Sequence, residues 1–95
     1  MAEPRWERLI VRLASGWQVT VRALLRPGEG GAKLEALDVV EAWTVVAPIV
    51  DCDEVARVEL TAKMRDGLRK ALLTSPNRRA CLDAAIANAT AGWRQ

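Results

Sequence analysis

The side chains that could support chemistry gather in two segments of the chain, and the first of these is acidic. Asp51, Asp53 and Glu54 surround Cys52, and carboxylates at this spacing are ligands for a hard cation such as Mg²⁺. The EF-hand pattern is not met, however, because no Gly stands at its sixth position. Negative charge nearby also disfavours the thiolate that a cysteine nucleophile needs. We therefore interpret Asp51 and Glu54 as the capping residues of a helix.

The second segment is basic and lies in the C-terminal third of the chain. Arg78 and Arg79 follow Pro76 in what reads as the first turn of a helix, where the helix dipole disfavours cations. A residue that breaks a local rule points to function, and arginines beside free backbone N–H groups can hold a phosphate or a carboxylate. We predict a partner- or anion-binding site made of Arg65, Arg69, Arg78, Arg79 and Trp93.

Several kinds of catalytic and cofactor site are excluded by composition or spacing. The chain has no His, so a Ser-His-Asp triad and a zinc site with imidazole ligands are both impossible within it. Cys52 and Cys81 lie far apart and form no CxxC motif, and a pair of free thiols is the expected state. No Lys-Ser/Thr pair follows the glycines at 28, 30 and 31, so the phosphate-binding loop pattern fails. We expect no catalytic residue, no metal and no cofactor, and thus no enzyme.

Length and charge indicate one small domain with segregated charge. The chain has 95 residues, of which 51% are hydrophobic, and this suits a single globular domain over residues 1–95. Residues 31–59 hold two basic and seven acidic side chains, a net charge of −5, whereas residues 60–95 hold seven basic and two acidic ones, a net charge of +5. This segregation favours binding to a charged partner.

The N-terminal segment and the length of the apolar stretches bear on the cellular compartment of the protein. Glu3 and Glu7 near the N-terminus do not suit a secretion signal. The longest apolar stretch, residues 42–50, is too short to span a bilayer and contains Pro48. We expect a cytoplasmic protein that does not bind membranes.

Residues 6–26 fit both a helical and a strand pattern. The β-branched residues favour strands, and Ala14-Ser15-Gly16 suits a three-residue hairpin loop with Gly16 in the left-handed conformation. Such a loop pairs Leu13 with Trp17, Val11 with Val19 and Leu9 with Val21, all on one face. We predict a β-hairpin here, with a helix as the alternative.

The rest of the chain reads as helical. Apolar spacing predicts a helix over residues 32–47, ended by Pro48, and a second from Asp51 to about Thr74, although residues 56–64 also alternate like a strand. Ser75 and Pro76 predict the start of a third helix, which Gly92 would stop. The predicted fold is α+β, an N-terminal β-hairpin packed against about three helices; an all-α four-helix bundle is the alternative.

These observations favour a non-enzymatic protein-interaction module, that is, an adaptor, inhibitor or assembly component. Small proteins of this kind act through charged and Trp-containing surface patches. The partner is another protein, or a second copy of the chain in a homodimer, because a hairpin leaves sheet edges open. The alternative function is nucleic-acid binding by the basic C-terminal helices, which would give a steep salt dependence.

Overall fold

The computed structural model describes residues 3–14, 16–28, 31–48 and 53–93. Its first half is a four-stranded antiparallel sheet in the order β1-β2-β3-β4. The strands are β1 (Arg5–Arg12), β2 (Trp17–Gly28), β3 (Gly31–Pro48) and β4 (Asp53–Val58). Two helices follow, α1 (Ala62–Thr74) and α2 (Pro76–Ala89), and then a short 3₁₀ helix η1 (Ala91–Trp93). The α+β class is confirmed, and the all-α alternative is wrong.

The N-terminal hairpin has the predicted strand register. Leu9 pairs with Val21 and Val11 with Val19, and the Leu13 N–H donates to the Trp17 carbonyl at 2.8 Å. Gly16 has a φ of 88°, a conformation that Gly adopts without a steric penalty. The alternation of side chains across a strand therefore places Leu9, Val11, Val19 and Val21 on one face, where all four are buried.

The predicted helix over residues 32–47 is wrong, because this segment is the long strand β3. Its register with β2 shifts twice, leaving Glu35 and Val40 without a paired residue. Each such bulge adds one residue to the strand, so the residues that face the core fall at positions 34, 37, 39 and 42. These spacings of three and two residues break the strict alternation typical of a strand, so the apolar pattern of this segment did not indicate one.

The predicted helix from Asp51 to Thr74 is wrong over its first half. Strand β4 occupies Asp53–Val58, and α1 begins only at Ala62, where the Thr61 hydroxyl accepts a hydrogen bond from the Met64 N–H at 3.2 Å. The proposed cap Asp51 lies outside the described residues. The alternating pattern that begins at Ala56 was thus the better guide, but only as far as Val58.

The predicted boundary at Ser75 and Pro76 is confirmed, with differences of detail. Ser75 alone separates the two helices, and its N–H donates to the Ala71 carbonyl at 2.9 Å. It occupies the N-cap position of α2, but its side chain makes no capping hydrogen bond. The last α-helix ends at Ala89 with Thr90 as its C-cap, so Gly92 lies in η1 and is not the stop signal. The described residues thus form two α-helices rather than about three.

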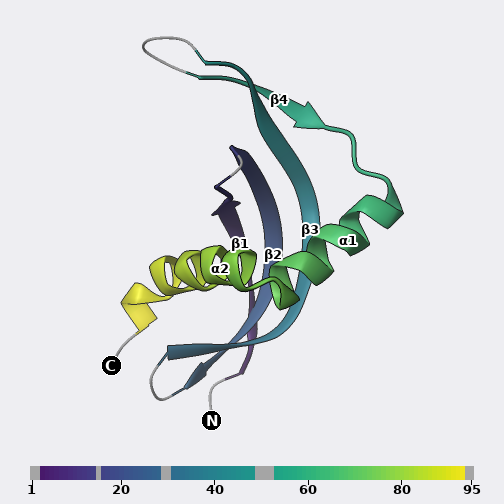
Figure 1. Ribbon diagram of the computed structural model, residues 1–95. Coiled ribbons are helices and arrows are strands. Elements are labelled where there is room, and N and C mark those ends of the chain that lie inside the picture. The colour runs from purple at the N-terminus through teal and green to yellow at the C-terminus, as the bar shows by residue number, and fades with distance from the viewer. Residues whose placement is uncertain (1–2, 15, 29–30, 49–52, 94–95) are drawn as a thin grey trace.

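Both helices lie on the same face of the sheet and run across its strands (Figure 1). Helix α1 packs mainly on β3, and α2 packs mainly on β1. Leu72, Leu82 and Ile86 from the helices join the buried residues of the sheet in one core. We call this side of the sheet the covered face. Burial of apolar side chains on it provides the main driving force for folding.

Candidate binding surface

Neither of the two described helices lies on the second face of the sheet (Figure 1), and we call it the open face. Strand pairing assigns its residues, because paired residues share a face and neighbours along a strand alternate. In the rows of the sheet that cross β1, the described residues of the open face are Trp6, Arg8, Ile10, Arg12, Gln18, Thr20, Arg22, Leu24, Ala36, Asp38, Glu41, Trp43 and Arg57. Four arginines and two carboxylates give these rows a net charge of +2. Arg26 and Lys33 continue the face beyond the end of β1, toward the β2–β3 turn.

Apolar side chains are exposed on this face. The side chain of Ile10 is 57% exposed and that of Trp6 is 44% exposed. Trp43 and Leu24 are half-buried on the same face. A solvated face of an antiparallel sheet is usually polar, so the exposed Ile and Trp side chains make this face unusually apolar.

Three arginines of the open face contact neighbouring side chains on the same face. Glu41 accepts a hydrogen bond from Arg8 at 3.2 Å, and its second oxygen lies 3.6 Å from Arg57. The Arg22 guanidinium lies 4.9 Å from the centre of the Trp6 ring, a cation–π contact. Within the described part of the chain, Arg12 makes no ion pair, and one carboxylate serves both Arg8 and Arg57. The open face therefore has guanidinium groups available to an external carboxylate or phosphate.

The site predicted from the sequence lies on the helices instead. Arg65 and Arg78 are exposed and, among the described residues, make no ion pair. Arg69 lies 3.7 Å from Asp66, and Arg79 donates to Asp83 at 2.9 Å. These contacts reduce the positive potential of the helices.

The fifth predicted residue, Trp93, lies in η1 and is half-buried. The Arg5 guanidinium covers its ring at 4.1 Å from the centre. Within the described residues, none of the five predicted side chains makes an ion pair, hydrogen bond or ring contact with another of the five. Their assembly into one site stays a prediction.

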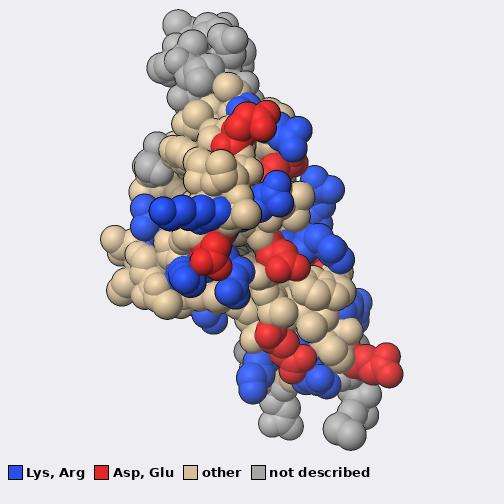
Figure 2. All heavy atoms as spheres, turned by 90° about the vertical axis from the view of Figure 1, so that its right-hand side faces the viewer, with Lys and Arg blue, Asp and Glu red and all other residues tan. Residues whose placement is uncertain are grey.

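The surface beside α1 and the β4 edge has mixed charge. Figure 2 shows basic and acidic side chains next to one another on this side, without an extended area of one sign. Asp66 contributes to this mixture, because it lies 3.0 Å from Lys70 as well as near Arg69. A phosphate backbone binds best to a continuous basic surface, and this side does not present one.

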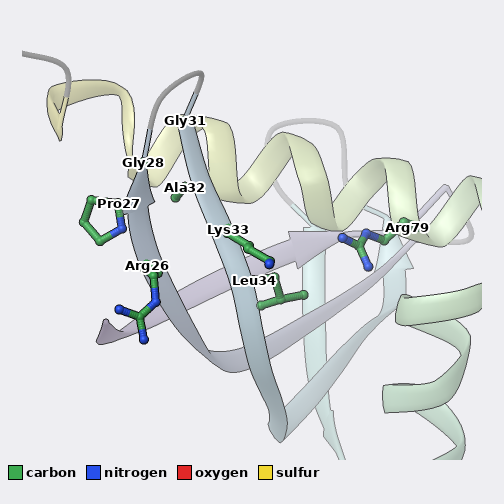
Figure 3. A pocket seen from close by; sticks show the side chains of 8 residues that line it. All are labelled: Arg26, Pro27, Gly28, Gly31, Ala32, Lys33, Leu34 and Arg79. Atoms are coloured by element: carbon green, nitrogen blue, oxygen red, sulfur yellow. The ribbon is translucent and has the colours of Figure 1, made fainter. Parts of the chain in front are cut away.

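A shallow hollow of about 580 Å³ lies between the β2–β3 hairpin and α2, lined in part by Arg26, Lys33 and Arg79. Figure 3 shows Lys33 and Arg79 extending toward each other from β3 and α2. Arg26 donates two hydrogen bonds to Glu35, at 2.7 and 3.2 Å. These bonds lower the pKa of the Glu35 carboxyl and raise that of Arg26. Since Arg79 is paired with Asp83, two of the three cations of the hollow already have carboxylate partners.

The described residues hold no group of acidic and cysteine side chains that could bind a metal ion. The side chains of Asp53 and Glu54, like residues 51 and 52, are outside the described set, so the acidic segment singled out in the sequence is not placed. Cys81 is a free thiol, half-buried on α2. No described helix is long and apolar enough to cross a membrane.

Comparison with known protein families, curated proteins and solved structures finds no match to this chain. The structure itself defines a small α+β domain, a four-stranded meander with two helices on one face and a second face that carries Trp, Ile and Arg side chains.

The open face was missed in the sequence, although a signal for it was present. Once the hairpin places Leu9 and Val11 in the core, Trp6, Arg8, Ile10 and Arg12 must point the other way. The contributions of Asp38, Glu41 and Trp43 could not be found, because the segment that contains them was interpreted as a helix.

Proposed function

We propose that this chain is a non-enzymatic protein-interaction module and that the open face is its binding surface. The observation that carries the proposal is the exposure of Ile10 and Trp6 on a face that neither helix covers. Trp and Arg are the residues most enriched at the energetic centres of protein interfaces, and both types occur together on this face. The proposal needs no catalytic group, metal or cofactor.

The charge pattern supports a protein partner over a nucleic acid. Glu41 is held among the arginines of the open face by Arg8 and Arg57, and Asp38 is exposed there. These carboxylates interrupt the continuous basic surface that a phosphate backbone binds best, whereas protein interfaces commonly combine both signs of charge with apolar side chains. The arginines of α1 and α2 are a weaker candidate surface, because Asp66 and Asp83 partly neutralise them.

The test is affinity capture of partners from a lysate of the cell that makes the protein, using wild type and two matched variants. Ile10→Asp puts a charge on the open face, and Met64→Asp puts one at a similarly exposed apolar residue on α1. We expect a stoichiometric protein that survives nuclease treatment, is retained by Met64→Asp and is lost with Ile10→Asp.

Two results would contradict this proposal. Equal retention by both variants would remove the open face as the binding surface. Capture that disappears after nuclease treatment would favour nucleic-acid binding instead. Circular dichroism of each variant establishes that the fold is intact, so that loss of a partner reports on the surface and not on unfolding.

A further inference from the structure

We propose that the outer edge of β1 binds an extended, acidic segment of a partner protein as a fifth strand of the sheet. This inference rests on the proposed function, because it specifies what the open face and its border bind. Strand addition to a free sheet edge is a general mode of peptide recognition, in which main-chain hydrogen bonds give affinity and alternate side chains give specificity.

The backbone of β1 is suited to this role. It is an edge strand of eight residues, and its register with β2 is continuous, without a bulge. The other edge strand, β4, has six residues, and the register of β3 with it shifts between Val45 and Ala47. Bulges, shortness, proline and charged side chains protect sheet edges from pairing. Strand β1 has no bulge and no proline, since Pro4 precedes it, but it does carry charged side chains. Its arginines on the open face would repel a basic strand and attract an acidic one.

The free backbone groups of β1 belong to the residues of the open face. The Leu13 N–H bonds to Trp17, and hydrogen-bonded pairs alternate along an antiparallel ladder. The odd-numbered residues of β1 therefore bond to β2. The N–H and C=O groups that point outward are those of Trp6, Arg8, Ile10 and Arg12.

The side chains of these same four residues specify the partner. Arg and apolar residues alternate along the edge, and residues opposite each other on neighbouring strands have Cβ atoms about 5 Å apart. An added antiparallel strand would thus place carboxylates against Arg12 and Arg8, and apolar side chains against Ile10 and Trp6. In the order of its own chain, the segment reads acidic-x-apolar-x-acidic-x-apolar.

Charge argues against a second copy of the chain as the occupant. The only acid of β1 is Glu7, which is on the covered face with Leu9. No register of two β1 strands brings a β1 carboxylate against Arg8 or Arg12 on the open face. Pairing of two copies would instead gather four arginines along one short edge, which like-charge repulsion disfavours.

The test titrates the whole protein with the acetylated and amidated peptide Glu-Thr-Val-Thr-Glu-Thr-Val. Binding is measured from the NMR chemical shifts of the backbone amides of β1. We expect shifts at Arg8, Ile10 and Arg12, and no binding when Lys replaces both Glu of the peptide. N-methylation of the first Val and the second Glu blocks N–H groups that face β1 and should abolish binding. N-methylation of the first two Thr blocks only outward-facing groups and should preserve it.

Variants of the protein complete the test. Arg12→Glu should weaken binding of the peptide about two- to fivefold, the range expected from losing an exposed ion pair. Lys63→Glu reverses an exposed charge on α1, away from the open face, and should leave binding unchanged. Since Arg12 is exposed and unpaired among the described residues, neither change is expected to unfold the protein.

The results that would overturn strand addition can be distinguished from those that would overturn the proposed function. If methylation of the facing N–H groups leaves binding intact, the backbone edge is not used. If no peptide binds while partner capture still depends on Ile10, the open face binds a different kind of protein surface. A dimer that Ile10→Asp dissociates in sedimentation equilibrium would assign the edge to a second copy of the chain. Displacement of the peptide by oligo-dT would assign it to single-stranded nucleic acid.

Discussion

Leu9 and Ile10 are neighbours on β1 with similar chemistry, yet they lie on opposite faces of the sheet with opposite surroundings. Leu9 is 4% exposed beneath the helices, whereas Ile10 is 57% exposed on the open face. The covered face is apolar and closed by Leu72, Leu82 and Ile86. The open face mixes two Trp side chains with arginines that share few carboxylates.

This difference indicates that the two faces of the sheet have different roles. The residues of the covered face determine the fold, because they hold the apolar contacts between the sheet and the helices. The residues of the open face contribute little to that core, so their exposed apolar side chains need another explanation than stability. Binding of a partner provides one.

The largest expected effect comes from substituting the two neighbours themselves. Leu9→Ala should lower the free energy of unfolding by about 2–5 kcal/mol, because it leaves a cavity under the helices. Ile10→Ala should lower it by less than about 1 kcal/mol, the range of strand-propensity effects at an exposed site. Urea denaturation measures both. Equal losses would mean that the two faces do not differ as described.

A smaller effect on the free energy of unfolding is expected from a substitution within helix α1. Gly67 lies inside α1, and a Cβ added there would contact nothing within 4 Å. Gly67→Ala should therefore raise the free energy of unfolding by about 0.5–1 kcal/mol, because Gly is a poor helix former. Partner binding at the open face should not change. A matched control is Gly16→Ala, which should destabilise the fold because Gly16 has a positive φ.

The smallest expected effect is a pH dependence at the end of the β2–β3 hairpin. The hydrogen bonds from Arg26 lower the pKa of the Glu35 carboxyl in the folded state. Such a group stabilises the fold fully above its unfolded pKa, and this contribution is lost as pH falls through the folded pKa. Glu35→Gln should therefore be slightly less stable than wild type near neutral pH and equal to it in strong acid.

An NMR titration of the side-chain carboxyls checks the cause. The titration midpoint of Glu35 should lie below the ordinary range for Glu and should return to it in Arg26→Ala. A Glu35 midpoint that Arg26→Ala leaves unchanged would show that the ion pair does not act on this carboxyl. Because the pair is exposed, its effect on stability stays small and is screened by salt.

The sequence was sufficient for the parts of the fold that local rules control. The hairpin register followed from the recurrence of apolar residues at every second position (Leu9, Val11, Leu13) and from Gly16 at the turn. The start of α2 followed from Pro76, whose fixed φ and missing N–H suit the first helical position. In both places a single backbone conformation was favoured strongly enough to outweigh the alternatives.

The sequence was not sufficient where long-range pairing decides the structure. The bulges at Glu35 and Val40 arise from pairing of β3 with β2 and shift the inward residues out of strict alternation. Apolar spacing alone cannot distinguish that pattern from a helix. The same error concealed half of the open face, because Trp43 and Glu41 meet the hairpin only through this pairing. The predicted arginine site on the helices depends on tertiary proximity as well, and among the described residues no ion pair, hydrogen bond or ring contact joins its members.

The packing of α2 on β1 has a consequence for synthesis of the protein. The two elements lie near opposite ends of the chain, and Arg5 stacks on Trp93. The β1–β2 hairpin is local and can form in microseconds, but residues 76–93 are synthesised later. Until then, Leu9 and Val11 have no helix above them. We expect the nascent sheet to expose its future core for several seconds, at about 5–20 residues synthesised per second, a window in which a chaperone can bind it.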